Sequence, residues 1–206
     1  RLYDTTEGVI RVGGIDIKEY RLSEYRKIFG TIFQDFKIFA TTITNNVLLH
    51  KSITDEDIKK AKIALEASGI YNKIKNFPKG MDSQLTKEFE KDGVMMSGGE
   101  LQKIAIARVF AKESEIYIFD EPSSALDPLS EYEIFENMLK ACEDKTVIFI
   151  SHRLSSTIMA DMIYLFENGE IVESGTHEQL MKQNDRYAKM YQMQAEKYKE
   201  ELIYET

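Results

Sequence analysis

The sequence predicts an α/β fold in which a mainly parallel sheet is flanked by helices. Apolar runs at 116–120 and 146–151 resemble buried strands, and they alternate with helical patterns at 97–111 and 129–142. Such an alternation is typical of parallel sheets, because a crossover helix joins one parallel strand to the next. A further observation is the helical character of residues 44–108, which predicts a helical subdomain beside the sheet.

Strand patterns also precede the helical region. Residues 9–17 contain two short apolar segments around a Gly-Gly turn, which predicts an antiparallel pair of strands. The apolar run 28–33 predicts a buried strand that is bounded by Gln34 and Asp35. The expected sheet therefore has strands on both sides of the helical region in the sequence.

The segment after Thr54 carries the clearest helix signals of residues 44–108. Three acidic residues follow Thr54, as at a helix N-terminus, and Gly69 provides a stop. Four residues at helical spacing are expected on one face: Ile58, Ala61, Leu65 and Ser68. Residues 76–80 predict a turn-rich loop.

The C-terminal region predicts a hairpin followed by a helix. Residues 162–166 and 171–172 flank an Asn168-Gly169 turn, and residues 186–202 have the composition of a polar, exposed helix. The sequence contains no low-complexity linker and no internal repeat. We therefore expect residues 1–206 to form one domain.

The length, net charge and cysteine content of the chain limit the classes of protein to which it can belong. A chain of 206 residues with a net charge of −8 can bury a sizeable core, and its charge argues against nonspecific nucleic-acid binding. The single cysteine, Cys142, excludes an intrachain disulfide and favours a reducing compartment. No apolar run approaches the roughly 20 residues of a membrane span, and no signal peptide is visible. Because the sequence starts at Arg1 in mid-pattern, we expect it to be a piece of a longer protein.

Two adjacent carboxylates, Asp120 and Glu121, follow the apolar strand at 116–120. On a strand they would point to opposite faces and could perform different tasks. An Asp at this position can hold Mg²⁺, usually through water, and the next carboxylate can orient or polarise an attacking water. The alternative is that Asp-Glu-Pro merely ends the strand in a turn.

Two further polar residues stand at strand ends. His152 follows the strand at 146–151, where it would emerge at the same edge as Glu121 and could contact a γ-phosphate or the attacking water. The amide of Gln34, at the end of an earlier strand, can ligate a metal and sense a neighbouring loop. Taken alone, His152 is better explained as an ordinary histidine at a strand-loop junction, and Gln34 alone is very weak evidence for a site.

The stretch Ser97-Gly98-Gly99-Glu100 begins the helix at 97–111. Ser97 and Glu100 have the spacing of a capping box, and two glycines without Cβ atoms allow a phosphate to approach the helix N-terminus. The element could also be a capping box and nothing more. Similarly, the segment from Ser124 to Asp127 could be a plain helix start before Pro128.

In this order the motifs resemble those of the nucleotide-binding domain of ATP-binding cassette (ABC) transporters. Residues 96–100 resemble the family signature, with Met for the usual Leu and Glu for the usual Gln. Residues 116–121 are similar to the Walker B strand with its catalytic glutamate, 124–127 to the D-loop, and 151–153 to the segment of the switch histidine. Residues 32–35 resemble the Q-loop. The resemblance covers essentially the whole chain and implies a fold like that of the P-loop NTPases.

Other segments point to the exporter branch of the family. Residues 39–47 are similar to the exporter segment after the Q-loop, and 173–180 to its C-terminal region. Residues 87–93 stand where exporters carry an acidic loop that contacts the membrane domain. Their spacing departs from the common pattern by about one residue, so the resemblance leaves open which acid makes the contact.

One family motif is absent from the sequence. A P-loop of the form G-x-x-x-x-G-K-[ST] cradles the β- and γ-phosphates, but no Gly in this chain is followed by Lys. Residues 1–4 resemble what normally follows that motif by the length of a helix. We therefore expect an N-terminal truncation, and the piece alone is expected to be inactive.

The resemblance implies a function for the remaining residues. Two domains would close head to tail around two ATP molecules, with Mg²⁺ held at Asp120 and Gln34 and with Glu121 and His152 as catalytic residues. The partner domain would present Ser97, Gly98, Gly99 and Glu100 to the nucleotide, and Asp127 would belong to the D-loop. Hydrolysis would drive a transmembrane domain, expected to be fused upstream, so that this domain lies on the cytoplasmic face of the membrane and the substrate is exported.

Two alternatives remain at this point. One is a degenerate ABC module that binds ATP without hydrolysing it, although the presence of Glu121 and His152 weighs against this. The other is the ATPase head of a DNA-maintenance protein, which shares the signature. Such heads insert a long coiled coil between Q-loop and signature, whereas no sustained heptads separate Gln34 from Ser97 here.

Overall fold

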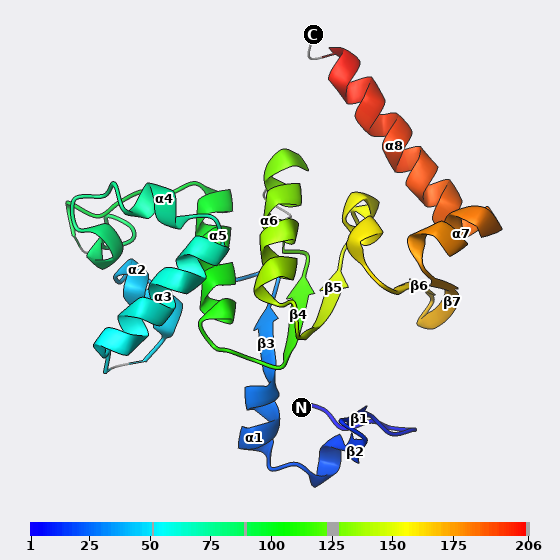
Figure 1. Cartoon of the computed structure of the whole chain (residues 1–206), viewed down its shortest axis with the longest axis horizontal. Helices are drawn as coiled ribbons and strands as arrows, with labels where there is room; N and C mark the ends of the chain where they lie inside the picture. Colours follow the sequence, from blue (N-terminus) through cyan, green and yellow to red (C-terminus); the bar gives the residue numbers. More distant parts are fainter. Residues whose placement is uncertain (51, 89, 123–127, 205–206) are drawn as a thin grey trace. The chain divides into compact units, whose positions relative to one another are not determined.

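The computed structural model describes residues 1–50, 52–88, 90–122 and 128–204 (Figure 1). The chain divides into two compact units, Arg1–Ile150 and Ser151–Thr206. The first unit contains a three-stranded parallel sheet and a group of helices. The second contains a hairpin and the two C-terminal helices.

The central sheet of the first unit has the strand order β3-β4-β5. Its strands are β3 (Phe29–Ile32), β4 (Ile116–Asp120) and β5 (Thr146–Ile150), and both pairings are parallel. The predicted strands are therefore confirmed, with ends within one or two residues of the expected ones. Because all three strands run in the same direction, their carboxyl ends lie at one edge of the sheet.

Two helices cover one face of this sheet, α5 (Gly98–Phe110) and α6 (Pro128–Ala141). Aromatic rings hold this layer together: Phe119 stacks on Phe149 with centroids 5.3 Å apart, and Phe135 of α6 meets the ring of Phe149 edge-on at 4.9 Å. The opposite face is less covered, since Ile148 and Ile150 remain 46% and 50% exposed. The buried core therefore lies between the sheet and these two helices.

A second core lies among the helices that connect β3 to β4. They are α2 (Ile43–Leu48), α3 (Asp55–Ala67), α4 (Tyr71–Ile74), the 3₁₀ turn η2 (Gly80–Asp82) and α5. Helix α5 belongs to both cores, because Ile104 and Ala107 face the other helices while Ala105 and Ile106 face the sheet. This double role explains why apolar residues surround α5 in the sequence, as expected for a helix buried on most sides.

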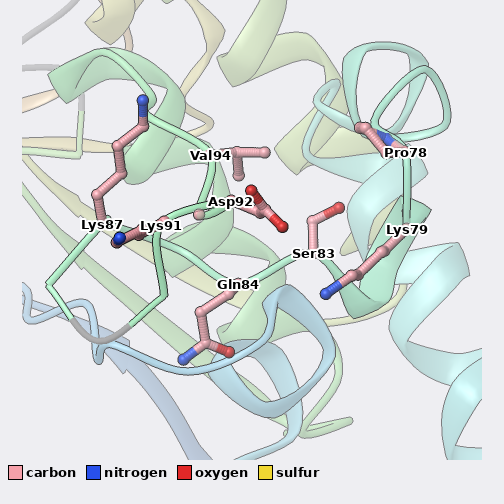
Figure 2. A pocket seen from close by; sticks show the side chains of 9 residues that line it. Pro78, Lys79, Ser83, Gln84, Lys87, Lys91, Asp92 and Val94 are labelled. Atoms are coloured by element: carbon pink, nitrogen blue, oxygen red, sulfur yellow. The ribbon is translucent and has the colours of Figure 1, made fainter.

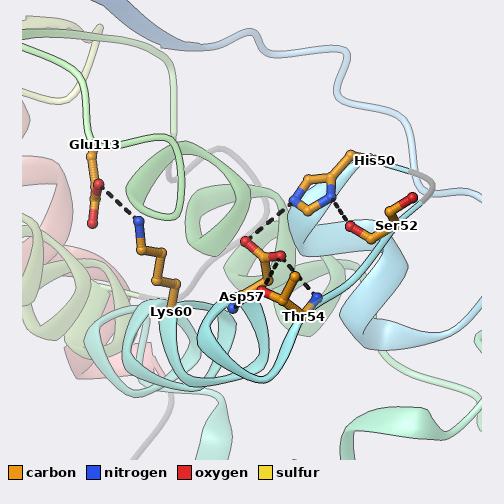
Figure 3. Close-up of polar contacts among 6 residues, drawn as sticks. All are labelled: His50, Ser52, Thr54, Asp57, Lys60 and Glu113. Atoms are coloured by element: carbon orange, nitrogen blue, oxygen red, sulfur yellow. Dashed lines mark hydrogen bonds and ion pairs between the residues drawn. The ribbon is translucent and has the colours of Figure 1, made fainter.

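The start of α3 follows the predicted pattern. The Thr54 hydroxyl accepts a hydrogen bond from the Asp57 N–H at 3.3 Å, and the Asp57 carboxylate accepts one from the Thr54 N–H at 2.9 Å (Figure 3). Hydrogen bonds from the backbone and hydroxyl of Thr54 hold the pKa of Asp57 below its ordinary value. Of the four residues expected on one face, Ala61, Leu65 and Ser68 are buried, whereas Ile58 is 44% exposed at the margin of that face.

A buried asparagine fixes the segment between β3 and α2. Asn46 is fully buried, and its amide oxygen accepts from the Phe39 N–H at 2.9 Å. Its amide nitrogen donates to the carbonyl oxygens of Phe39 and Thr42 at 2.9 and 3.1 Å. One side chain thus bonds three backbone groups at the start of α2, and it is the acceptor that the structure gives the Phe39 N–H.

Substituting Asn46 by Ala is expected to lower the free energy of unfolding by about 1–3 kcal/mol, because the Phe39 N–H loses the acceptor that Asn46 provides and a fully buried side chain is truncated. Chemical denaturation followed by circular dichroism measures this change. The matched control is Asn45→Ala on the same helix, since the Asn45 side chain bonds only the Thr41 hydroxyl, at 3.2 Å, among the residues that the structure describes. That control is expected to cost less than about 1 kcal/mol; an equal loss in the two variants would contradict this account.

The N-terminal residues form the predicted antiparallel pair, shortened to two residues in each strand. Strand β1 (Arg11–Val12) pairs with β2 (Ile15–Asp16) across the Gly-Gly turn. The turn needs glycines, because φ is +57° at Gly13 and +81° at Gly14. The short η1 (Ile17–Glu19) and helix α1 (Leu22–Ile28) then lead into β3.

The second unit contains the predicted hairpin. Strands β6 (Ile163–Glu167) and β7 (Glu170–Gly175) pair antiparallel across the Asn168-Gly169 turn, where both residues have positive φ. The turn η3 (Leu154–Met159) precedes this hairpin, and α7 (His177–Gln183) and α8 (Arg186–Tyr204) follow it.

Helix α8 differs from the exposed helix that the sequence predicts. Its first turn is anchored, because Tyr187 and Ala188 are fully buried. Tyr187 packs with Leu154, Ile163 and Leu180 in the small core of the second unit.

Candidate functional site

The N-terminus of α5 carries the residues predicted to meet a nucleotide. The capping box is confirmed: the Ser97 hydroxyl accepts from the Glu100 N–H at 3.4 Å, and the Ser97 N–H donates to the Glu100 carboxylate at 2.9 Å. Ser97 and Gly98 are exposed, while Gly99 and Glu100 are half-buried. The turn is thus accessible from outside its own chain, and the positive end of the helix dipole favours an anion there.

The carboxylate of Glu100 is engaged within its own chain. It pairs with the Lys73 ammonium at the end of α4, in addition to its bond with Ser97. Burial raises the pKa of Glu100, but the hydrogen bonds from Lys73 and Ser97 outweigh this and hold the pKa below its ordinary value. Glu100 therefore stabilises the shape of the turn, and its charge is already compensated by Lys73.

The two acids after Phe119 lie in different backbone environments. Asp120 is the last residue of β4 and pairs with Ile150 of β5. Glu121 lies beyond the strand in the left-handed region, at φ +47°, and its N–H donates to the Ile150 carbonyl at 2.9 Å. Strand alternation therefore does not apply to Glu121, because a turn rather than the strand sets the direction of its side chain. A left-handed non-glycine residue is uncommon and is enriched at functional sites.

Gln34 stands at the same edge of the sheet as these acids. It lies in an exposed turn two residues after β3, and Ile32 at the end of β3 pairs with Phe119. The structure therefore places Asp120 at the carboxyl end of its strand, and Gln34 and Glu121 just after the ends of neighbouring parallel strands. This is the position at which α/β sheets bind ligands.

His152 belongs to the second unit and follows the last residue of β5 by two positions. It is exposed, and its backbone carbonyl accepts a hydrogen bond from the Gln194 side chain at 2.7 Å. The neighbouring Ser151 hydroxyl accepts from the Arg153 N–H at 3.0 Å. A tight turn thus begins directly after the sheet.

The remaining predicted residue, Asp127, lies outside the described residues. Among the residues that the structure describes, no group of three or more His, Cys, Asp or Glu side chains could hold a metal ion by itself. The oxygen donors of Asp120 and Gln34 nevertheless fit Mg²⁺, which keeps several waters and takes one or two protein ligands together with phosphate oxygens.

Sequence reasoning missed one residue that joins two parts of the site. Arg108 of α5 donates to the Asn46 carbonyl at 2.8 Å and to the Lys37 carbonyl at 3.0 Å. Its guanidinium also lies 5.6 Å from the ring centroid of Phe39. The segment after Gln34 is thereby tied to the helix that begins at Ser97. An arginine within the apolar C-terminal half of the helix was the signal available in the sequence.

A pocket of about 530 Å³ lies in the loops on both sides of η2. Figure 2 shows Lys87 and Lys91 on one side of the Asp92 carboxylate and Lys79 on the other. Ser83 is only 3% exposed, and its hydroxyl has no hydrogen-bond partner within the described part of the chain. The pocket is lined by nine residues: Pro78, Lys79, Ser83, Gln84, Lys87, Lys91, Asp92, Gly93 and Val94.

The pocket distinguishes two acids of the predicted contact loop. Glu90 pairs with Lys79 at 3.7 Å, and Asp92 lines the pocket. Gly93 must remain a glycine, since a Cβ there would lie 1.8 Å from the Thr86 carbonyl oxygen.

The fold and the motifs at its sheet edge define an ATP-binding domain, and comparison with known proteins identifies the family. A family model described as "ABC transporter" matches residues 1–124, so the chain belongs to the ABC transporter family. It is similar to the ATP-binding part of exporters. The ATP-dependent lipid A-core flippase of Coxiella burnetii is 40% identical over 199 residues, which cover 94% of this chain and 32% of the flippase.

Two further comparisons agree. ATP-binding cassette sub-family B member 6 of Homo sapiens is 37% identical over 194 residues, covering 94% of this chain and 22% of that protein. The structure of a bacterial Atm1-family ABC exporter with ATP bound superimposes with a TM-score of 0.83 at 32% identity, covering 95% of this chain and 33% of the exporter. The chain thus spans between about a fifth and a third of the length of these relatives. None of the helices in the described part of the chain combines the length and the apolar composition of a membrane span.

Proposed function

We propose that this chain is the ATP-hydrolysing domain of an ABC exporter that closes as a dimer around ATP. One observation carries the proposal: the parallel strands place Gln34, Asp120 and Glu121 at one sheet edge, while the Ser97 turn is exposed on a separate helix N-terminus. An exposed Ser-Gly-Gly turn is suited to a phosphate held by a second molecule, because its backbone donors are accessible. In this arrangement, ATP binding favours the closed pair and hydrolysis releases it.

The roles of the site residues follow from this arrangement. Glu121 orients and polarises the attacking water, and His152 is the second catalytic residue, by resemblance to the switch histidine of the family. Asp120 and Gln34 would hold Mg²⁺ directly or through water; the ion, when bound, neutralises charge on the phosphates. Ser97, Gly98, Gly99 and Glu100 of the partner domain form the other wall, together with Asp127 of the D-loop.

The partners proposed for this domain are a second ABC ATPase domain, identical or related, and a transmembrane domain fused upstream. The length of the exporter relatives supports the fusion. The proposed location of this domain is the cytoplasmic face of a membrane. We propose residues 44–108 as the helical subdomain within a single ATPase domain, and Asp92 as the acid that contacts the membrane domain. Asp92 is favoured because it lines an open pocket, whereas Glu90 pairs with Lys79.

The 206-residue chain alone is expected to show negligible ATPase activity, because its sequence contains no Gly-Lys pair to form a P-loop. A version extended with its native upstream sequence is expected to hydrolyse ATP. Phosphate release at saturating ATP and Mg²⁺ compares the two proteins. Robust turnover by the 206-residue chain would contradict this proposal, and so would an extended protein that carries a P-loop and binds ATP without hydrolysing it.

A further inference from the structure

Helix α8 reaches back to the backbone around His152. The side-chain amide of Gln194 makes two hydrogen bonds there: its oxygen accepts from the Leu154 N–H at 2.9 Å, and its nitrogen donates to the His152 carbonyl at 2.7 Å. All three residues belong to the second unit. One amide therefore holds the chain on both sides of Arg153.

One of these backbone groups, the N–H of Leu154, needs a partner from outside its own segment. The N–H of Leu154 is the first of the 3₁₀ turn η3, and the first amides of a helical turn have no partner within it. Arg153 provides no side-chain cap for this turn. Gln194 thus takes the place of a cap, from 40 residues away in the sequence.

A second contact holds α8 against the same segment. The Tyr187 hydroxyl lies 2.7 Å from the Thr157 hydroxyl and 2.8 Å from Nδ1 of His177. Tyr187 is fully buried and packs with Leu154 in the core of the second unit. Because α8 is fixed at its first turn, Gln194, about two turns later, is presented to the His152 segment in a defined position.

We infer that Gln194 is a positioning residue, which fixes the backbone from His152 to Leu154 and thereby the direction in which the His152 side chain leaves the turn. The inference rests on the proposed function, in which His152 acts on the γ-phosphate or its attacking water. Two hydrogen bonds restrict the φ and ψ angles on both sides of Arg153, and imidazole placement within about 0.5 Å matters for catalysis. Loss of the amide should therefore slow the chemical step more than it weakens ATP binding.

The experiment compares Gln194→Ala, Gln194→Glu and a matched control, Gln192→Ala, in the N-terminally extended protein. Gln192 is exposed on the same helix, so its loss tests the effect of removing a glutamine from α8 alone. The Glu variant keeps the acceptor for Leu154 but loses the donor to His152. Two readouts are used: kcat and KM for ATP, and hydrogen exchange of the Leu154 amide by NMR.

Gln194→Ala is expected to lower kcat about fivefold to tenfold with KM for ATP changed less than about twofold, and to abolish the exchange protection of Leu154. Gln194→Glu should lower kcat similarly while retaining much of that protection, and Gln192→Ala should match the parent protein. Unchanged Leu154 exchange in Gln194→Ala would overturn the contact itself. Lost protection with a kcat equal to that of the control would overturn the positioning role.

The readouts also separate this inference from the proposed function. A parent protein that binds ATP without turnover would count against both the ATPase assignment and the positioning role, whatever Leu154 shows. A parent that hydrolyses ATP, loses turnover on Glu121→Gln and is indifferent to Gln194→Ala would leave the proposed function standing and overturn only the inference.

Discussion

Glu121→Gln is expected to lower ATP turnover of the N-terminally extended protein by about 10²–10⁴-fold, because a neutral amide cannot accept the proton of the attacking water. The substitution preserves the size of the side chain, so ATP affinity and folding should change little. Phosphate release and nucleotide binding by fluorescence anisotropy measure the two effects separately.

The matched control is Glu115→Gln. Glu115 directly precedes β4, at the opposite end of the strand that leads to Glu121, and it pairs with Lys145 at 2.9 Å. Such an exposed pair contributes little, about 0–1 kcal/mol, so turnover should stay within about twofold of the parent protein. Equal losses in the two variants, or full turnover with Gln at position 121, would exclude Glu121 as the catalytic base.

Ser97→Asp is expected to reduce turnover at least about 100-fold without unfolding the helix. Aspartate is a good N-cap, so α5 should keep its start, but a negative charge would then face the phosphates of ATP. Juxtaposed like charges cost several kcal/mol at a desolvated contact, which corresponds to this loss. Turnover and the melting temperature are measured together.

Thr54→Asp provides the matched control for this substitution. Thr54 also caps a helix within a capping box, with the acidic Asp57 in the place of Glu100. Both substitutions put a second carboxylate beside an existing one, so their melting temperatures should shift by similar amounts. If Thr54→Asp reduced turnover as strongly as Ser97→Asp, the effect of the signature variant would come from folding rather than from the nucleotide.

The parts of the fold that depend on local patterns were predictable from the sequence. The strand at 116–120 was predicted from its apolar run, and the hairpin from its Asn168-Gly169 turn. Both signals lie within the element itself. The capping boxes at Thr54 and Ser97 depend on residues only three positions apart, and both are confirmed. The order of the motifs along the chain then indicated the family, and the family resemblance implied the roles of the site residues.

Features that depend on tertiary contacts were not predictable in the same way. Ile58 has the spacing of a core residue, yet it lies at the margin of the buried stripe of α3 and stays exposed. The left-handed backbone of Glu121 has no signal in the sequence, because Gly or Asn would be the usual residue there. The contact of Gln194 with His152 joins residues 42 positions apart, and no local pattern encodes it.

The central claim is that Glu121 of one molecule and Ser97 of another belong to the same nucleotide pocket. The most direct test is the mass of the extended Glu121→Gln protein, measured by size-exclusion chromatography with light scattering. This account predicts a monomer without nucleotide, a dimer with ATP and Mg²⁺, and a monomer again when Ser97→Asp is added at the same ATP concentration. A protein that stays monomeric at saturating ATP, or a dimer that Ser97→Asp leaves intact, would contradict it.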